Sequence, residues 1–186
     1  MKRNNDKRTR LITGADKLFH QQGINTTTLA NIAQLADVPL GNVYYYFKSK
    51  ESIILAVIEY RLKTLQQLFD ELNLITTAKE RIKAFIEKFV SDTDIITSFG
   101  DPVGSLCLEL SKENGELHKS AIALMQIVVS WCETQFNELG KQSNSQQLAL
   151  HLIASLQGIS LLTSTFKNPN YLKEYSEFLK NWLNTI

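Results

Sequence analysis

Three consecutive tyrosines, Tyr44 to Tyr46, follow a proline and a glycine and precede two lysines in the segment VPLGNVYYYFKSKE. Successive side chains of an α-helix are about 100° apart. Val43 and Phe47 therefore share one side of a short helix and form its apolar stripe, while Tyr45 points away from it. Phenolic hydroxyls and lysine ammonium groups both donate hydrogen bonds to phosphate oxygens. The pattern predicts a short helix whose aromatic side faces a partner outside its own core.

The distribution of charge agrees with a polyanionic partner. The 186 residues carry a net charge of +1, yet residues 1–50 contain eight basic and three acidic groups, a net of +5, which leaves −4 on the remainder. A basic segment attached to an acidic body is typical of a nucleic-acid-binding head. A solvated charged tail would give the same counts, so charge alone leaves both interpretations open.

Composition narrows the class of protein. The apolar fraction of 44% is ordinary for a globular chain, and we find no uncharged apolar run of about 18 residues and no signal-type segment. We therefore expect a cytoplasmic protein without a membrane partner. Cys107 and Cys132 lack a CxxC pattern, and His118 and His151 lack partners at metal-ligand spacing. We expect no metal and no cofactor.

Catalytic patterns are missing from the sequence. It contains no paired carboxylates, phosphate-binding loop or nucleophile elbow. We therefore predict no catalytic residues and do not expect an enzyme.

Helical periodicity extends over nearly the whole chain. Leu11, Ala15 and Phe19 form the stripe of a first helix, and Gly23 is a typical glycine after a helix end. No alternating strand pattern appears, so the predicted fold class is all-α with about nine helices. Their approximate ranges are 6–22, 29–36, 41–47, 49–73, 77–98, 101–114, 116–139, 144–166 and 168–183.

The second and third of these helices are short and joined by a tight turn, which predicts a helix-turn-helix whose second short helix enters the DNA major groove. The outward side of this helix carries Gly41, Asn42 and Tyr45. Gly41 lets the backbone approach the DNA closely, and the Asn42 side chain can donate to and accept from an adenine edge. The basic segment from Lys2 to Arg10 is expected to reach a neighbouring groove or phosphates. Residues suited to phosphate oxygens surround this side: Thr27, Thr28, Tyr44, Tyr46, Lys48 and Lys50.

Simpler roles stay open for several of these side chains. Tyr44 and Tyr46 can pack against neighbouring helices instead. Thr27 and Thr28 can act only as helix caps. Lys48 can be solvated without any partner.

A series of positions between residues 8 and 58 matches a known pattern. The matching residues are Leu18-Phe19, Gly23, Thr27-Thr28-Leu29, Ile32-Ala33, Ala36, Val38, Gly41, Val43-Tyr44, Tyr46-Phe47 and Ser49-Lys50-Glu51. The segment resembles the DNA-binding domain of the tetracycline-repressor (TetR) family of bacterial regulators. Pro39 and Leu40 depart from the usual residues, and a thymine methyl is the base partner that Leu40 could take.

The resemblance implies base contacts around Leu40, Gly41, Asn42 and Tyr45. It implies phosphate contacts at Thr27, Tyr44, Tyr46 and Lys50, to which the hydroxyl of Thr28 adds a further candidate. It also divides the chain into a DNA-binding domain, residues 1–48, and a ligand-binding and dimerisation domain, residues 49–186.

The last two predicted helices, about residues 145–183, carry more apolar surface than one core needs. Their stripes are Leu148, Leu152, Ser155, Leu156, Ile159 and Leu162, and Tyr171, Tyr175, Phe178, Leu179, Trp182 and Leu183. The family implies that these helices pair with a second copy, so we expect a homodimer with two-fold symmetry and a palindromic double-stranded DNA operator. Packing within one chain is the alternative.

The central segment has the pattern G-x-L-x-x-E-L, from Gly104 to Leu110, and resembles a subgroup of the family. It suggests a pocket for an unknown small-molecule inducer around Phe99, Leu106, Cys107, Leu110, Met125, Trp131 and Gln157, each of which could instead be an ordinary core residue. The expected function is a repressor that an inducer releases from its operator. A transcriptional activator, or a regulator in which Cys107 responds to redox state or electrophiles, stays open.

Overall fold

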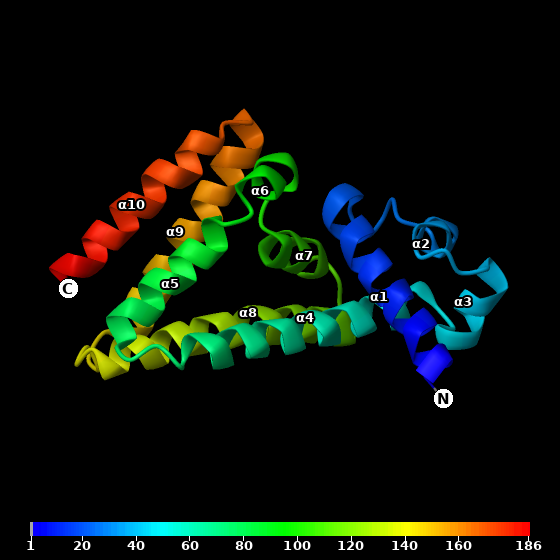
Figure 1. The fold of residues 1–186 in the computed structure, drawn as a ribbon, viewed down its shortest axis with the longest axis horizontal. Helices are drawn as coiled ribbons and strands as arrows, with labels where there is room; N and C mark the ends of the chain where they lie inside the picture. The colour runs from blue at the N-terminus through cyan, green and yellow to red at the C-terminus, as the bar shows by residue number, and fades with distance from the viewer. Residues whose placement is uncertain (1) are drawn as a thin grey trace. The chain divides into compact units, whose positions relative to one another are not determined.

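The structure is a computed structural model that describes residues 2–186 and the side chains of residues 6–186. Over this part of the chain the regular secondary structure is helical, which confirms the all-α prediction. The helices are α1 (Lys2–Gln22), α2 (Leu29–Leu35), α3 (Leu40–Tyr46), α4 (Lys50–Leu72), α5 (Ala78–Val90), α6 (Thr93–Phe99), α7 (Pro102–Leu110), α8 (Gly115–Glu138), α9 (Ser145–Phe166) and α10 (Pro169–Thr185), as Figure 1 shows.

The chain divides into two compact units. Unit one comprises the residues up to Lys63 together with Ser105–Leu124, and unit two comprises Thr64–Gly104 with Met125–Ile186. Helices α4, α7 and α8 each contribute one part to each unit. These units do not test the predicted boundary after residue 48 between a DNA-binding and a ligand-binding domain, which stays a prediction.

Local hydrogen bonds fix the short helices of unit one. Gly23 has φ +85°, a left-handed conformation that ends α1. Thr28 begins α2 with a capping box, in which its side chain accepts from the Asn31 amide and the Asn31 side chain accepts from the Thr28 amide. Ser49 caps α4, since its hydroxyl accepts from the Ser52 amide at 3.1 Å. The glycine expected after the first helix and the cap role left open for Thr28 are thereby confirmed.

A buried ion pair joins α1 to α4 within unit one. Arg61 Nε lies 2.6 Å from Asp16 Oδ1, and both side chains are largely buried. Burial raises the pKa of the Asp16 carboxyl above its ordinary value, although the positive charge of Arg61 acts in the opposite direction. The ion pair therefore offsets only part of the cost of placing this carboxylate inside the protein.

The core of unit two is built on aromatic packing. Trp131 stacks on Phe69 with ring centroids 4.8 Å apart, and Phe85 packs against the same indole at 5.4 Å. The buried residues of α9 and α10 complete the core, and α10 lies against both α9 and α5 (Figure 1). Their buried side chains in this cluster are Ala149, Leu152, Ile153, Leu156, Leu179 and Leu183.

The helix predicted over residues 77–98 is in fact two helices. Thr77 and Glu80 have the T-x-x-E pattern of a capping box, and Thr77 does cap α5, but α5 ends at Val90 and α6 begins at Thr93. Ser91 and Thr93 donate their hydroxyl hydrogens to the backbone oxygens of Lys88 and Val90, and such local bonds compete with helical ones. Asn144 and Gln147 also have the spacing of a capping box, but the Asn144 side chain makes no cap hydrogen bond.

Helix α9 differs from the expectation that no segment could cross a membrane. Its 22 residues are long and apolar enough to do so by length and composition alone. One of its sides is buried against α10 and α6 in the core of unit two. A core helix of this kind meets the same criterion, so the finding is weak evidence for a membrane span.

The buried ion pair leads to a prediction about stability and pH. Arg61→Met leaves Asp16 buried without its counter-charge and should lower the free energy of unfolding by about 2–3 kcal/mol near pH 8. The pKa of Asp16, already raised, rises further in this variant, so protonation favours the folded state. That contribution is present at acid pH and is lost as the pH rises through the folded pKa.

Urea unfolding of wild type and variant at several pH values measures this effect. The deficit of Arg61→Met should shrink as the pH falls from 8 towards 5. Lys63→Met is a matched control on α4, since it removes only the exposed pair with Glu59 and should cost well under about 1 kcal/mol. Equal deficits at both pH values would contradict the assignment.

Candidate nucleic-acid interface

Helix α3 presents its aromatic side to solvent. Val43 is fully buried and Phe47 nearly so, whereas Tyr44 is 51% and Tyr45 67% exposed. The backbone around the helix agrees with the sequence pattern, since the Phe47 amide donates to Val43 and ends α3 in an extended conformation. The apolar stripe thus holds this short helix in unit one and leaves the tyrosines on the outside.

The first turn of α3 is open as well. A Cβ atom added at Gly41 would have no other heavy atom within 4 Å, and Asn42 is half-buried beside it. Leu40 is 43% exposed, although the helical wheel places it near the buried stripe. Pro39 at the N-cap offers no side-chain hydrogen bond, so the start of α3 is unobstructed.

The remaining tyrosine and the two lysines border this surface. Tyr46 is half-buried, and its ring meets that of Tyr45 edge-on with centroids 5.0 Å apart. Lys48 Nζ donates to the backbone oxygen of Tyr44 at 3.0 Å, and Lys50 Nζ donates to that of Asn25 at 3.3 Å. These contacts hold both ammonium groups close to α3 and to the loop before α2.

The two threonines before α2 differ from each other. Thr28 is exposed and serves as the cap of α2. Thr27 is 0% exposed, and its hydroxyl donates to the Gly23 backbone oxygen at 2.7 Å and accepts from Gln22 Nε2 at 3.2 Å. The hydroxyl is occupied inside the protein, so in this conformation the Thr27 side chain is not available to a phosphate. The family pattern gave no signal of this burial.

The first helix begins earlier in the basic N-terminal segment than the predicted start at residue 6. Helix α1 already begins at Lys2, while the side chains of Lys2 and Arg3 lie outside the described part of the structure. Arg10 Nε donates to the Ala36 backbone oxygen at 2.9 Å, and Arg8 lies over the Phe47 ring. Arg10 therefore ties α1 to the end of α2.

The residues suggested for an inducer pocket fall into both units. Leu106, Cys107 and Leu110 belong to unit one and are buried, and the Cys107 thiol donates to the Ala121 backbone oxygen at 3.5 Å. A buried thiol with a hydrogen-bond partner is poorly placed for a reaction.

The other candidates belong to unit two. Phe99 is exposed, Met125 is half-buried, and Trp131 is part of the aromatic core. The Trp131 Nε1–H donates to Asn73 Oδ1 at 3.0 Å, so this residue has a structural role. Gln157 is half-buried, and its Nε2 donates to Asp101 Oδ2 at 3.0 Å.

Polar contacts around Asp101 were only partly visible in the sequence. Asp101 directly precedes Pro102, a pattern that predicts a helix cap, and its Oδ2 does accept from the Gly104 amide at 2.6 Å. The Asp101 amide also donates to Ser160 Oγ at 2.7 Å. A Cβ atom at Gly104 would lie 1.9 Å from Gln157 Oε1, which explains the glycine of the G-x-L-x-x-E-L segment.

Comparisons with known proteins agree with this geometry. A family model described as bacterial regulatory proteins, tetR family, matches residues 11–57. The regulator LmrA of Bacillus subtilis is similar, with 28% identity over 184 residues, 96% of this chain and 97% of that protein.

Solved structures show the same fold. A TetR transcriptional regulator from Chloroflexus aurantiacus has a TM-score of 0.85, with 22% identity over 99% of this chain and 97% of its own. The regulator FadR from Bacillus subtilis, solved with stearoyl-CoA, has a TM-score of 0.73 with 20% identity over 94% and 96%. Residues 11–57 therefore match the helix-turn-helix segment of the tetR family of bacterial regulatory proteins, and over nearly its full length the chain is similar to a helix-turn-helix transcriptional regulator.

Proposed function

We propose that this protein is a repressor that binds a palindromic operator as a homodimer and releases it when a small molecule binds. The observation that carries the proposal is the division of α3 into a buried stripe, Val43 and Phe47, and an exposed aromatic side. An exposed group of tyrosines on a helix of this kind fits the major groove and its flanking phosphates better than it fits solvent.

The chemistry of the exposed side assigns the contacts. In this proposal Asn42 and Tyr45 contact base edges, and Leu40 contacts a thymine methyl group. Tyr44 and Tyr46 have hydroxyls for phosphate oxygens on either flank. Further phosphate donors are Lys48, Lys50 and the backbone around Thr28. The local net charge of +5 over residues 1–50 adds the general attraction that all DNA-binding proteins need.

Gly41 supports a close approach of DNA to α3. A glycine inside a helix is unfavourable relative to alanine. Gly41 has no left-handed backbone, and no neighbouring atom would meet a Cβ. Neither strain nor packing within the chain explains the missing side chain, so we assign the space to the DNA.

A side of α9 supports the homodimer. Leu152, Leu156 and Ile159, expected on the pairing stripe, are buried in their own unit. The exposed side is rotated from that stripe and has helical spacing. Its exposed residues are Gln147, His151, Ala154, Gly158, Leu161, Leu162 and Thr165. Phe178 and Tyr171 add exposed aromatic surface on α10.

Gly158 lies in the middle of this exposed side. A Cβ atom there would meet nothing within 4 Å, and its backbone is not left-handed. Small residues such as Gly158 and Ala154 allow two helices to approach closely. We therefore propose that α9 and α10 pair with the same helices of a second copy, which accounts for the apolar character of α9 without a membrane.

The inducer in this proposal is a small apolar or aromatic molecule. FadR, a structural relative of the whole chain, holds stearoyl-CoA in its solved structure. A ligand releases the DNA if it binds the conformation that does not fit DNA more tightly than the one that does. A difference of only a few kcal/mol in its binding free energy is enough. The buried, hydrogen-bonded thiol of Cys107 favours a bound ligand over thiol chemistry. We propose a cytoplasmic, non-enzymatic regulator.

The proposal is tested by binding of the full-length protein to duplex DNA from upstream of its own gene. Affinity should fall steeply as salt rises, because phosphate contacts release counterions. A duplex of unrelated sequence should bind more weakly by about a thousandfold or more. Equal affinity for both duplexes, or no binding in dilute buffer, would overturn the proposal.

Two substitutions in unit one should affect DNA binding in different ways. Tyr45→Ala removes a base contact and should reduce the preference for the operator over unrelated DNA by about tenfold. Lys50→Ala should weaken binding to both duplexes and lower the slope of log affinity against log salt by about 1. Fluorescence anisotropy with both duplexes measures the two effects. Identical profiles for the variants would argue against this division of roles.

Gly41→Ala should separate stability from function. The alanine should raise the free energy of unfolding by up to about 1 kcal/mol. The added methyl should reduce operator affinity by about tenfold, because it occupies the space assigned to DNA. The salt slope should stay as in wild type, because no charge changes. An alanine variant that binds the operator like wild type would show that the space is not used.

Gly158→Glu tests the pairing surface. The glutamate adds bulk and charge at an exposed position and should leave the single chain folded. It should raise the dimer dissociation constant by about a hundredfold or more, because a charge would be buried without a partner. Analytical ultracentrifugation measures this. Thr134→Glu, at an exposed site on α8, is the control and should stay dimeric.

A further inference from the structure

The loop between α1 and α2 is held by a side chain far away in sequence. The backbone amide of Ile24 donates to Glu109 Oε2 at 2.8 Å, although the two residues are 85 positions apart. Glu109 lies on α7, in the part of that helix that belongs to unit one together with α1 and α2. It is also the acidic residue of the G-x-L-x-x-E-L segment, and neither the DNA contacts nor the dimer uses it.

The position of the Glu109 carboxylate is electrostatically unfavourable. Glu109 is in the last turn of α7 and contacts the loop directly after the end of α1. Carboxylates are disfavoured near helix C-termini, where the helix dipole is negative. A negative charge on the DNA-binding unit also repels phosphates. General electrostatics therefore does not explain a glutamate here, whereas its reach to the Ile24 amide does.

Gly23 makes room for the carboxylate. A Cβ atom at Gly23 would lie 3.2 Å from Glu109 Oε2 and 3.4 Å from Oε1. The same glycine needs its left-handed backbone to end α1. The end of α1 is thus shaped both to turn the chain and to admit the side chain from α7.

The loop that Glu109 holds sets the start of α2. On one side of Ile24, the Gly23 backbone oxygen accepts from the buried hydroxyl of Thr27. On the other side, the Asn25 oxygen accepts from Lys50 on α4. The loop ends at Thr28, the cap of α2, and α2 packs against both α1 and α3. The pose of α3 therefore depends on contacts that include the one from Glu109.

We propose that Glu109 is a positioning residue for DNA binding. Its carboxylate fixes the Gly23–Thr28 loop through the Ile24 amide, so the pose of the helix-turn-helix depends on α7. The inference rests on the proposed function, because it requires that α3 binds DNA. It assigns a role in that binding to a residue that does not touch DNA.

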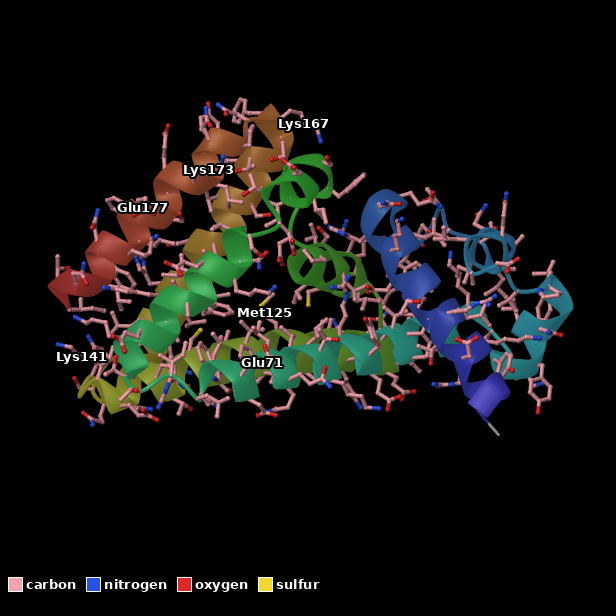
Figure 2. All side chains as sticks on the ribbon, viewed as in Figure 1. Glu71, Met125, Lys141, Lys167, Lys173 and Glu177 are labelled. Carbon is pink, nitrogen blue, oxygen red and sulfur yellow. The ribbon has the colours of Figure 1, made fainter. Side chains whose placement is uncertain are left out.

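The other end of α7 is also held by specific polar contacts. In unit two, Asp101 caps the helix at the Gly104 amide and is bonded to Gln157 and Ser160 on α9. Lys167, at the turn between α9 and α10 (Figure 2), donates to the backbone oxygens of Thr97 and Ser98 at the end of α6. Within unit two, the residue before α7 is thus held to α9 by hydrogen bonds with Ser160 and Gln157.

Two substitutions separate the reach of the side chain from its charge. Glu109→Asp keeps the charge but is one methylene shorter, so its carboxylate no longer reaches Ile24. Glu109→Gln keeps the length and a carbonyl acceptor but is neutral. If Glu109 positions the loop, the aspartate variant should bind the operator about tenfold more weakly. The glutamine variant should bind at least as tightly as wild type.

A purely electrostatic effect would give a different result for the aspartate variant, which therefore decides between the two explanations. Removal of a negative charge would then strengthen binding in Glu109→Gln, and Glu109→Asp would bind like wild type. Glu113→Gln is the control, since Glu113 is an exposed glutamate just beyond α7. It removes the same charge without touching the loop, and it should bind as tightly as wild type or slightly more tightly.

Operator anisotropy and amide hydrogen exchange of the full chain measure both parts of the inference. Exchange at Ile24 should be about tenfold faster in Glu109→Asp than in wild type, while amides in the core of unit two stay unchanged. Operator binding by Glu109→Asp equal to wild type would overturn the inference and leave the proposed function standing. Failure of wild type itself to bind DNA would overturn the proposed function, and this inference with it.

Discussion

A seven-residue helix has room for one apolar stripe, and α3 uses it for Val43 and Phe47. Burial of these two side chains fixes the rotation of the helix about its own axis. The tyrosines therefore do not need individual restraints to face outward, because the stripe places them. The head can present a bulky aromatic surface with few residues, and the rest of unit one serves to hold this short helix firmly.

Much of this arrangement can be predicted from the sequence because it is local. The rotation of α3, the caps at Thr28, Thr77 and Asp101, and the left-handed glycine at Gly23 depend on residues within one or two turns. Each signal names both partners of the interaction within a few positions. The all-α class follows from the same local periodicity.

Features that depend on distant partners could not be predicted in this way. The burial of Thr27 was missed as well, although its partners Gln22 and Gly23 are only five and four positions away, because the pattern marks only a threonine before a helix. On α9, apolar residues occupy more than one side, so periodicity alone could not say which side is buried. The contact between Glu109 and Ile24 joins residues 85 positions apart and has no local signal except the motif that contains it.

The two tryptophans have a consequence for spectroscopy. Trp131 is stacked in the core of unit two, and Trp182 lies in the same unit with its ring 4.8 Å from that of His151. Unit one contains tyrosines but no tryptophan in the sequence it covers. Indole emission therefore reports on unit two alone, while four of the six tyrosines, Tyr44, Tyr45, Tyr46 and Tyr60, lie in unit one. Tryptophan fluorescence therefore distinguishes unfolding of unit two from structural changes confined to the DNA-binding part.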